Sequence, residues 1–96
     1  MIAIRRIEPH EIPTAKDLIY RIAHQLFLDG RTLEEAVVYY EARGQLHDMD
    51  KVQETYFDND GLFLVMTDED RIIGTGAIRK LDDTTCELQR VWLAAL

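Results

Sequence analysis

The spacing of apolar residues changes within this 96-residue chain, at a turn over residues 58–61. Before the turn, apolar residues recur every three or four positions, which is typical of amphipathic helices; after it, they fall in short runs typical of strands. The first helical stretch shows the spacing most clearly, at Ile12, Ala15, Leu18, Ile19, Ile22, Ala23, Leu26 and Phe27. Helices and sheet therefore come from separate parts of the chain, which predicts an α+β fold with a mainly antiparallel sheet.

The expected helices cover residues 13–28, 32–44 and roughly 48–56. Thr32, with Glu35 three positions later, forms a capping box that starts the second helix. The expected strands are residues 2–7, with one face buried, and then residues 62–67, 71–81 and 86–93. The order is strand, two to three helices, then a three-stranded antiparallel meander, all within a single domain over residues 1–96.

Composition and charge exclude several classes of function. The net charge is −7, from 18 acidic and 11 basic residues, and no basic cluster is present to contact nucleic acid. The acidic balance is explained either by solubility or by a cationic amine substrate. No apolar run approaches the length of a membrane span. The single cysteine, Cys86, excludes an internal disulfide, which fits a reducing compartment, so the protein is expected to be cytoplasmic. The thiol of Cys86 is expected to be buried.

No metal site is expected. The three histidines lack metal-ligand spacing. Asp48 and Asp50 are interpreted as helix-start residues, while Asp58 and Asp60 are interpreted as turn residues, because no completed calcium loop follows them.

Two features of the strands allow more than one interpretation. Gly74-Thr75-Gly76 lies inside a strand, where glycine usually marks a bulge or a close backbone approach. Glu87 is either an outward-facing residue paired with Arg79 or Lys80, or a base whose pKa is raised in a cleft. The residues alone favour the outward-facing interpretation.

Residues 72–93 resemble the second, third and fourth strands of the GNAT superfamily of N-acetyltransferases. Gly74-Thr75-Gly76-Ala77-Ile78 resembles the family's xxGxGxI strand. A short acidic turn, Asp82-Asp83-Thr84, follows, and then Glu87-Leu88-Gln89-Arg90 resembles the start of an xELxRxxV strand. The preceding strand and helices match the family's order, so the resemblance covers nearly the whole chain.

The resemblance implies an acetyl-CoA-dependent transfer of an acetyl group to a small amine. Backbone groups of the fourth strand would bind the cofactor and polarise the thioester carbonyl, which here means Val91, Trp92 and Leu93. Glu87 falls where some members place a general base. The two helices usually shape the acceptor pocket, which would bring in Phe27, Tyr39 and Tyr40.

The family's next segment is a glycine-containing turn whose backbone amides hold the cofactor's pyrophosphate. This chain ends at Leu96, where that turn would begin. The expectation is an N-terminal half that is inactive or weakly active alone. It would form a homodimer through its last strand, or pair with a complementing C-terminal half. The alternative is a non-catalytic homodimeric or partner-binding module derived from the same fold.

Overall fold

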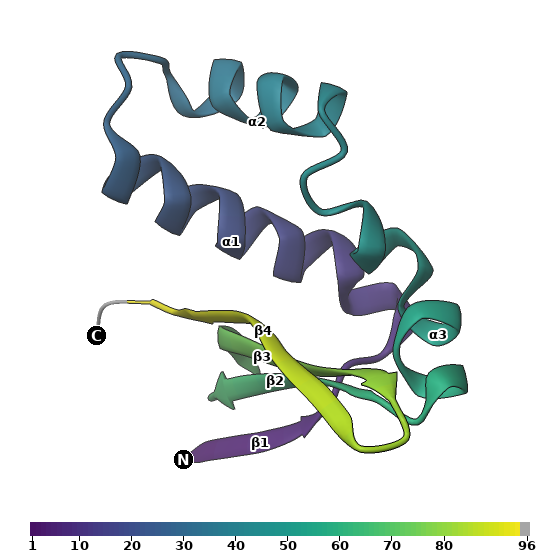
Figure 1. Ribbon diagram of the computed structural model, residues 1–96. Helices are drawn as coiled ribbons and strands as arrows, with labels where there is room; N and C mark the ends of the chain where they lie inside the picture. The colour runs from purple at the N-terminus through teal and green to yellow at the C-terminus, as the bar shows by residue number, and fades with distance from the viewer. Residues whose placement is uncertain (95–96) are drawn as a thin grey trace.

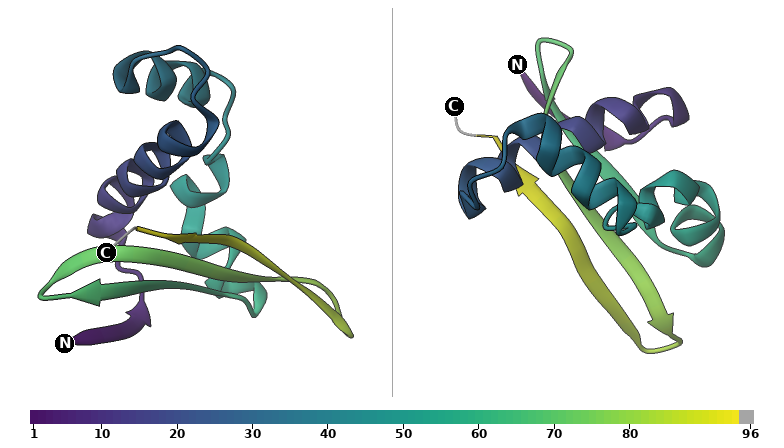
Figure 2. Two further views of the ribbon diagram at one scale, coloured as in Figure 1. Left: turned by 90° about the vertical axis from the view of Figure 1, so that its left-hand side faces the viewer. Right: turned by 90° about the horizontal axis from the view of Figure 1, so that it is seen from above.

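A computed structural model describes residues 1–94, and it shows a twisted sheet with the helices α1 and α2 on one face (Figures 1 and 2). The strands are β1 (Ile2–Arg6), β2 (Leu62–Asp68), β3 (Arg71–Asp82) and β4 (Thr85–Leu93). They lie in the order β1-β2-β3-β4, and each neighbouring pair is antiparallel. The predicted α+β order and the antiparallel meander are both confirmed.

The helices are α1 (Ile12–Phe27), α2 (Leu33–Ala42) and a single turn, α3 (Val52–Thr55). Short 3-10 helices flank them: η1 (Pro9–Glu11), η2 (His47–Lys51) and η3 (Phe57–Asn59). The predicted third helix is therefore half 3-10, in η2, and half α-helical, in α3. The chain continues past β4, and its residues 95–96 lie outside the described residues.

The predicted capping box at the start of α2 is confirmed. The Thr32 hydroxyl accepts a hydrogen bond from the Glu35 amide at 3.2 Å, and the Glu35 carboxylate accepts one from the Thr32 amide at 3.0 Å. These two bonds satisfy amides that the first turn leaves without a partner, so they fix where α2 begins.

The core lies between α1 and the helix-facing side of the sheet, and it extends under η2 and α3. Its largest fully buried side chains are Tyr56, Phe63, Ile19, Met49 and Val65. The Tyr56 and Phe63 rings meet edge to face, with centroids 5.3 Å apart. This contact joins the segment after α2 to the middle of the sheet.

The opposite side of the sheet, called the far face below, is not covered by the helices of the described chain (Figure 2). Its exposed apolar side chains are Ile2, Ile4, Leu62, Ile78, Leu88, Val91 and Leu93. The prediction that the strand over residues 2–7 has a buried face is wrong for β1, whose residues are all exposed, and holds only for Ile7, which follows β1 and lies in the core. Alternation shows which residues share a face of a sheet, but not whether another layer covers that face.

The expectation of a buried thiol at Cys86 is also wrong, because Cys86 is exposed. It lies near the tip of the β3–β4 hairpin, which extends beyond the helical layer (Figure 2). The helices of the described chain do not extend over that tip (Figure 2).

Candidate functional site

Strand β4 contains a bulge near its C-terminal end. Thr75 pairs with Trp92 and Ala77 pairs with Gln89, so Gly76 of β3 lies opposite two residues of β4, Arg90 and Val91. Arg90 has a φ of 55°, in the left-handed region. Its carbonyl accepts a hydrogen bond from the Thr75 hydroxyl at 2.7 Å. The glycine pair indicates a bulge or a close backbone approach in β3; the bulge is present at this point of the sheet, but its extra residue lies in β4, opposite Gly76.

The first glycine of that pair allows β3 and β4 to approach closely. A Cβ on Gly74 would lie 3.0 Å from the Trp92 carbonyl oxygen and 3.0 Å from a methyl carbon of Leu93. A Cβ on Gly76 would meet nothing within 4 Å. Gly74 is therefore needed for the contact between the strands, whereas Gly76 borders open space.

An ion pair ties the bulge to the segment after α2. The Arg90 guanidinium donates to the Asp48 carboxylate at 2.6 Å from Nη2 and at 3.1 Å from Nε, and Nη2 also donates to the Gln45 carbonyl at 3.0 Å. The Tyr56 hydroxyl donates to the same carboxylate at 2.5 Å. Asp48 therefore joins β4 to a fully buried core tyrosine.

The environment of this ion pair keeps it charged. Burial opposes ionisation of Asp48, but hydrogen bonds from Arg90 and Tyr56 outweigh that effect and hold the pKa of Asp48 below its ordinary value. The Asp48 carboxylate raises the pKa of Arg90. Burial, and then the hydrogen bond to Asp48, raise the pKa of Tyr56, which therefore stays a neutral donor.

Sequence reasoning does not find this cluster. It assigns Asp48 only as a helix-start residue, although Asp48 does stand in the first turn of η2. A usable signal is the arginine at position 90, because a cation in a strand beside a helical layer needs a carboxylate partner. Nothing in the sequence identifies which carboxylate that is.

A cavity of about 240 Å³ lies beside the bulge, between α1, the end of α2 and β4, and is called the aromatic pocket below. Its lining residues are Ile19, Tyr20, Ala23, Phe27, Tyr40, Gln45, Leu46, Arg90 and Trp92. The Tyr20 and Tyr40 rings stack with their centroids 6.0 Å apart. The pocket thus offers aromatic walls with few polar groups, as small-molecule sites commonly do.

The structure brings together only some of the residues expected to form an acceptor pocket. Phe27 and Tyr40 both line the aromatic pocket, together with Trp92 of β4. Tyr39 does not line the pocket. Its ring meets the Tyr40 ring edge to face, with the centroids 5.7 Å apart, and the guanidinium groups of Arg31 and Arg43 stand 3.8 and 4.3 Å from its ring centre. Adjacent helical residues point in different directions, so only Tyr40 of this pair faces the pocket.

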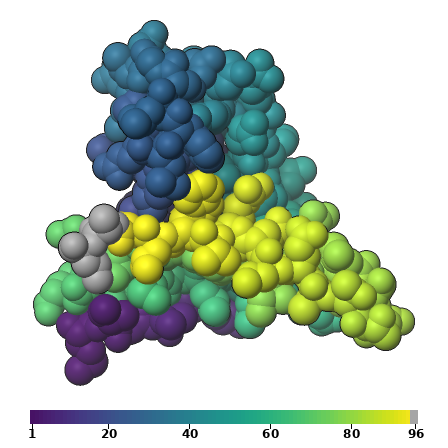
Figure 3. All heavy atoms as spheres, turned by 60° about the vertical axis from the view of Figure 1, so that its left-hand side comes forward, coloured from purple at the N-terminus to yellow at the C-terminus, as the bar shows by residue number. Residues whose placement is uncertain are grey.

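The expected cofactor and base residues occupy different parts of β4. Val91 and Leu93 are exposed on the far face, and Trp92 turns toward the helices. Glu87 is exposed, lies opposite Arg79 in the strand register, and does not line the aromatic pocket. In Figure 3, β4 (yellow) runs uncovered along the surface below the helices.

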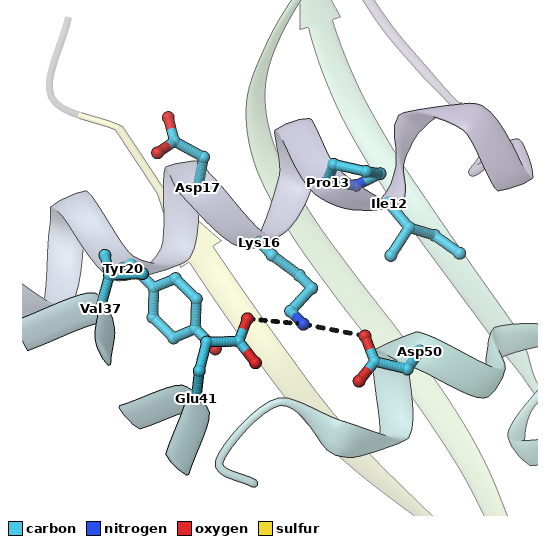
Figure 4. Close-up of a pocket in the computed structure, with 8 residues that line it drawn as sticks. All are labelled: Ile12, Pro13, Lys16, Asp17, Tyr20, Val37, Glu41 and Asp50. Carbon is cyan, nitrogen blue, oxygen red and sulfur yellow. Dashed lines mark hydrogen bonds and ion pairs between the residues drawn. The ribbon is translucent and has the colours of Figure 1, made fainter. Parts of the chain in front are cut away.

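A second, open depression of about 300 Å³ lies on the other side of Tyr20, and Figure 4 shows its lining residues. The Lys16 ammonium bridges Glu41 and Asp50 at 2.8 Å from each carboxylate. Burial and the nearby Glu41 carboxylate raise the pKa of Tyr20 to about 12. Lys16 therefore joins α1 to α2 and η2 at this depression, and its ammonium group is already paired with two carboxylates.

Within residues 1–94, no group of three or more His, Cys, Asp or Glu side chains is placed to hold a metal ion. None of the helices over the same residues has both the length and the apolar character needed to cross a membrane.

Comparisons with known proteins identify the fold. No protein-family model matches the chain, and no curated protein matches it. Solved structures do: an acetyltransferase of the GNAT family from Staphylococcus aureus Mu50 is similar over 98% of this chain and 53% of its own, with a TM-score of 0.78 and 17% identity.

Two more solved structures give the same result. An acetyltransferase from Streptococcus agalactiae 2603 is similar over 96% of this chain and 51% of its own, with a TM-score of 0.71 and 21% identity. The PaiA N-acetyltransferase from Thermoplasma acidophilum, in complex with coenzyme A, is similar over 97% of this chain and 58% of its own, with a TM-score of 0.68 and 18% identity.

The chain therefore spans about half the length of the structures it matches. Identities of 21% and below establish the arrangement of helices and strands but not the activity. The chain has the fold of the N-terminal half of a GNAT acetyltransferase.

Proposed function

We propose that this chain provides the N-terminal half of an acetyl-CoA-dependent N-acetyltransferase site, built around the bulge of β4. The observation that carries the proposal is the bulge itself, which lies next to the aromatic pocket. A bulge leaves one residue of a strand unpaired with its neighbour, so its backbone groups are free to bind a ligand. A solved structure with this fold is in complex with coenzyme A, which supports a cofactor of that chemical class.

The backbone of Val91, Trp92 and Leu93 is the proposed cofactor-binding segment. The segment fits such a group because β4 is an edge strand of the described sheet and its outer side is open to an extended ligand. Acetyl-CoA would supply an activated acetyl group there. A strand amide held by the bulge would donate to the thioester oxygen, and preorganised donors of this kind stabilise developing negative charge.

The aromatic pocket is the proposed acceptor site for a small amine. Phe27, Tyr40 and Trp92 supply apolar walls, and the faces of such rings also attract an ammonium group. The pocket and the proposed cofactor segment share Trp92, so an amine held in the pocket would stand beside β4. Tyr39 is not assigned to this site, because its ring is occupied by two arginines.

Glu87 is the proposed general base, on the strength of its place in the strand. It precedes Arg90 by three positions, or roughly 10 Å along an extended strand. A base that far from the bulge would take a proton from the amine through a chain of several water molecules rather than by direct contact. Glu87→Gln should then lower acetyl transfer while leaving cofactor binding unchanged.

We further propose that a second polypeptide segment completes the site by pairing with the outer edge of β4 ahead of the bulge, which leaves Val91–Leu93 open to the cofactor. The matched structures are nearly twice as long as this chain, which supports a complementing half. A second copy of this chain, paired through β4 in a homodimer, is the other segment that fits this edge. Measurement of mass in solution, with and without the complementing half, distinguishes the two.

An association module without catalysis is the second candidate function, favoured by the exposed apolar side chains of the far face. Leu88, Val91 and Leu93 are 70%, 61% and 58% exposed. Apolar patches of this kind commonly mark binding surfaces. Such a module would retain its function in the Glu87→Gln variant.

Calorimetric titration of acetyl-CoA into the purified chain, with mass measured in the same sample, tests the main proposal. Saturable binding is expected, either by the chain alone or after mixing with a complementing half. Absence of binding in both samples would contradict the proposal and favour the association module.

A further inference from the structure

Arg90 adopts a backbone conformation that is costly for an arginine. Its φ of 55° lies in the left-handed region, which residues with a Cβ occupy rarely. The other non-glycine residues with positive φ in the described chain lie at a helix end, in a loop or in the β2–β3 turn: Leu28, Asp60, Glu69 and Asp70. Arg90 alone among them lies within a strand, so surrounding contacts must hold it there.

Those contacts come from two sides. On the β3 side, the Thr75 hydroxyl donates to the Arg90 carbonyl at 2.7 Å. On the other side, the guanidinium binds Asp48 with two hydrogen bonds and the Gln45 carbonyl with one. The backbone of the bulge is thus fixed by β3, and its side chain by the segment that precedes α3.

Asp48 is itself held in place. Its carboxylate accepts a hydrogen bond from Tyr56, which is fully buried and packs against Phe63 of β2. The side chains of Arg90 and Asp48 are only 27% and 17% exposed, so water weakens the pair less than it weakens a surface pair. A continuous series of contacts therefore runs from the core to the bulge.

We propose that Arg90 and Asp48 are a positioning pair that holds the β4 bulge in its left-handed conformation. Neither residue is assigned a chemical step. They act through the backbone of Val91–Leu93, which they orient toward the ligand. The orienting role rests on the proposed function, whereas the effect of the pair on the bulge does not.

A matched control lies two residues from Asp48. Asp50 also belongs to η2 and also forms an ion pair, with Lys16 of α1 at 2.8 Å, but that pair lies away from β4. Asp48→Asn and Asp50→Asn make the same chemical change in the same short helix. Only the first removes charge from the Arg90 pair.

Amide hydrogen exchange, followed residue by residue by NMR without ligand, tests the pair. The reference is the amide of Ile7, which donates to the Phe63 carbonyl of β2 at 3.0 Å. Relative to that amide, Asp48→Asn and Arg90→Lys should each raise the exchange rate over residues 89–94 by about tenfold. Lysine keeps the charge but cannot form the two-pronged contact. Asp50→Asn should leave the same ratio unchanged.

An equal rise at all amides, or the same local rise in Asp50→Asn, would overturn the proposal. Arg90→Gly serves if Arg90→Lys does not fold, because glycine accepts positive φ while lacking the side-chain tie. It should show the local rise, with a loss of global stability similar to that of Asp48→Asn, because both variants break the same ion pair. Unchanged exchange over residues 89–94 in Arg90→Gly would also overturn the proposal.

Titration with coenzyme A separates this inference from the proposed function. If the wild-type chain binds, Asp48→Asn should weaken binding by about tenfold and Asp50→Asn should not. Equal affinity in Asp48→Asn would overturn the orienting role. If the wild-type chain binds neither alone nor after mixing with a complementing half, the cofactor proposal fails, while the exchange measurements still decide whether the pair holds the bulge.

Discussion

The guanidinium of Arg90 forms two hydrogen bonds with the carboxylate of Asp48, which lies 42 positions earlier in the chain. Through this contact the short helix η2 holds the end of β4, which is also the strand that lines the aromatic pocket. The contact therefore links the fold of the chain to the proposed site.

Asp48→Asn should lower the free energy of unfolding by about 1–3 kcal/mol, because it leaves a partly buried guanidinium without its counter-charge. Urea denaturation at neutral pH measures the change. Asp50→Asn should cost less than about 1 kcal/mol, since the Asp50 side chain is 43% exposed and Lys16 keeps its second partner, Glu41. Equal losses in the two variants would contradict this ranking.

Gly74→Ala should destabilise the protein by about 1–3 kcal/mol, because the added methyl group would overlap the Trp92 carbonyl and the Leu93 side chain. Gly76→Ala should change stability by less than about 1 kcal/mol, since its Cβ would enter open space. Thermal unfolding of the two variants, side by side, checks the difference. A Gly76→Ala variant as unstable as Gly74→Ala would show that the close approach of the strands is misassigned.

Stability should fall in acid partly because of Glu11. Its hydrogen bonds with Arg5, at 2.6 and 2.7 Å, lower the pKa of Glu11 from its ordinary 4.5 to about 2. A lowered carboxyl pKa contributes stability that is present above the unfolded value and is lost as pH falls. Wild type should therefore be more stable than Glu11→Gln at pH 7, with the difference vanishing between pH 4.5 and 2. A difference that persists at pH 2 would show that the glutamine perturbs packing instead.

Association through β4 should make the apparent mass depend on concentration. Leu88→Lys places a charge on an exposed strand residue, and charged edge residues discourage strand pairing. Light scattering should show wild type larger than a monomer and Leu88→Lys shifted toward the monomer. A wild-type chain that stays monomeric at high concentration would exclude the homodimer.

Much of the fold is predictable because local chemistry determines it. The three- and four-residue spacing defines α1, the Thr32–Glu35 box defines the start of α2, and short apolar runs define β2, β3 and β4. The glycine pair in β3 predicts the bulge, because glycine inside a strand usually marks a bulge or a close approach of another backbone.

The rest depends on contacts between distant residues. The Asp48–Arg90 pair joins positions 42 apart, and no local pattern specifies such a partner. The exposure of Ile2 and Ile4 depends on which layers cover the sheet, and the exposure of Cys86 depends on how far the hairpin extends. Among the expected pocket residues, Phe27 and Tyr40 meet at the cavity while Tyr39 does not, because the rotation of α2 decides which tyrosine faces β4.

The most direct test of the central claim is an acetyl-CoA titration followed residue by residue by NMR, with the complementing half added if the chain alone does not bind. A cofactor site at the bulge should give saturable shifts at the amides of Gly76 and residues 90–93, with little change at the β1 and β2 amides. Saturable shifts confined to another part of the chain, or none under either condition, would contradict a cofactor site at the β4 bulge.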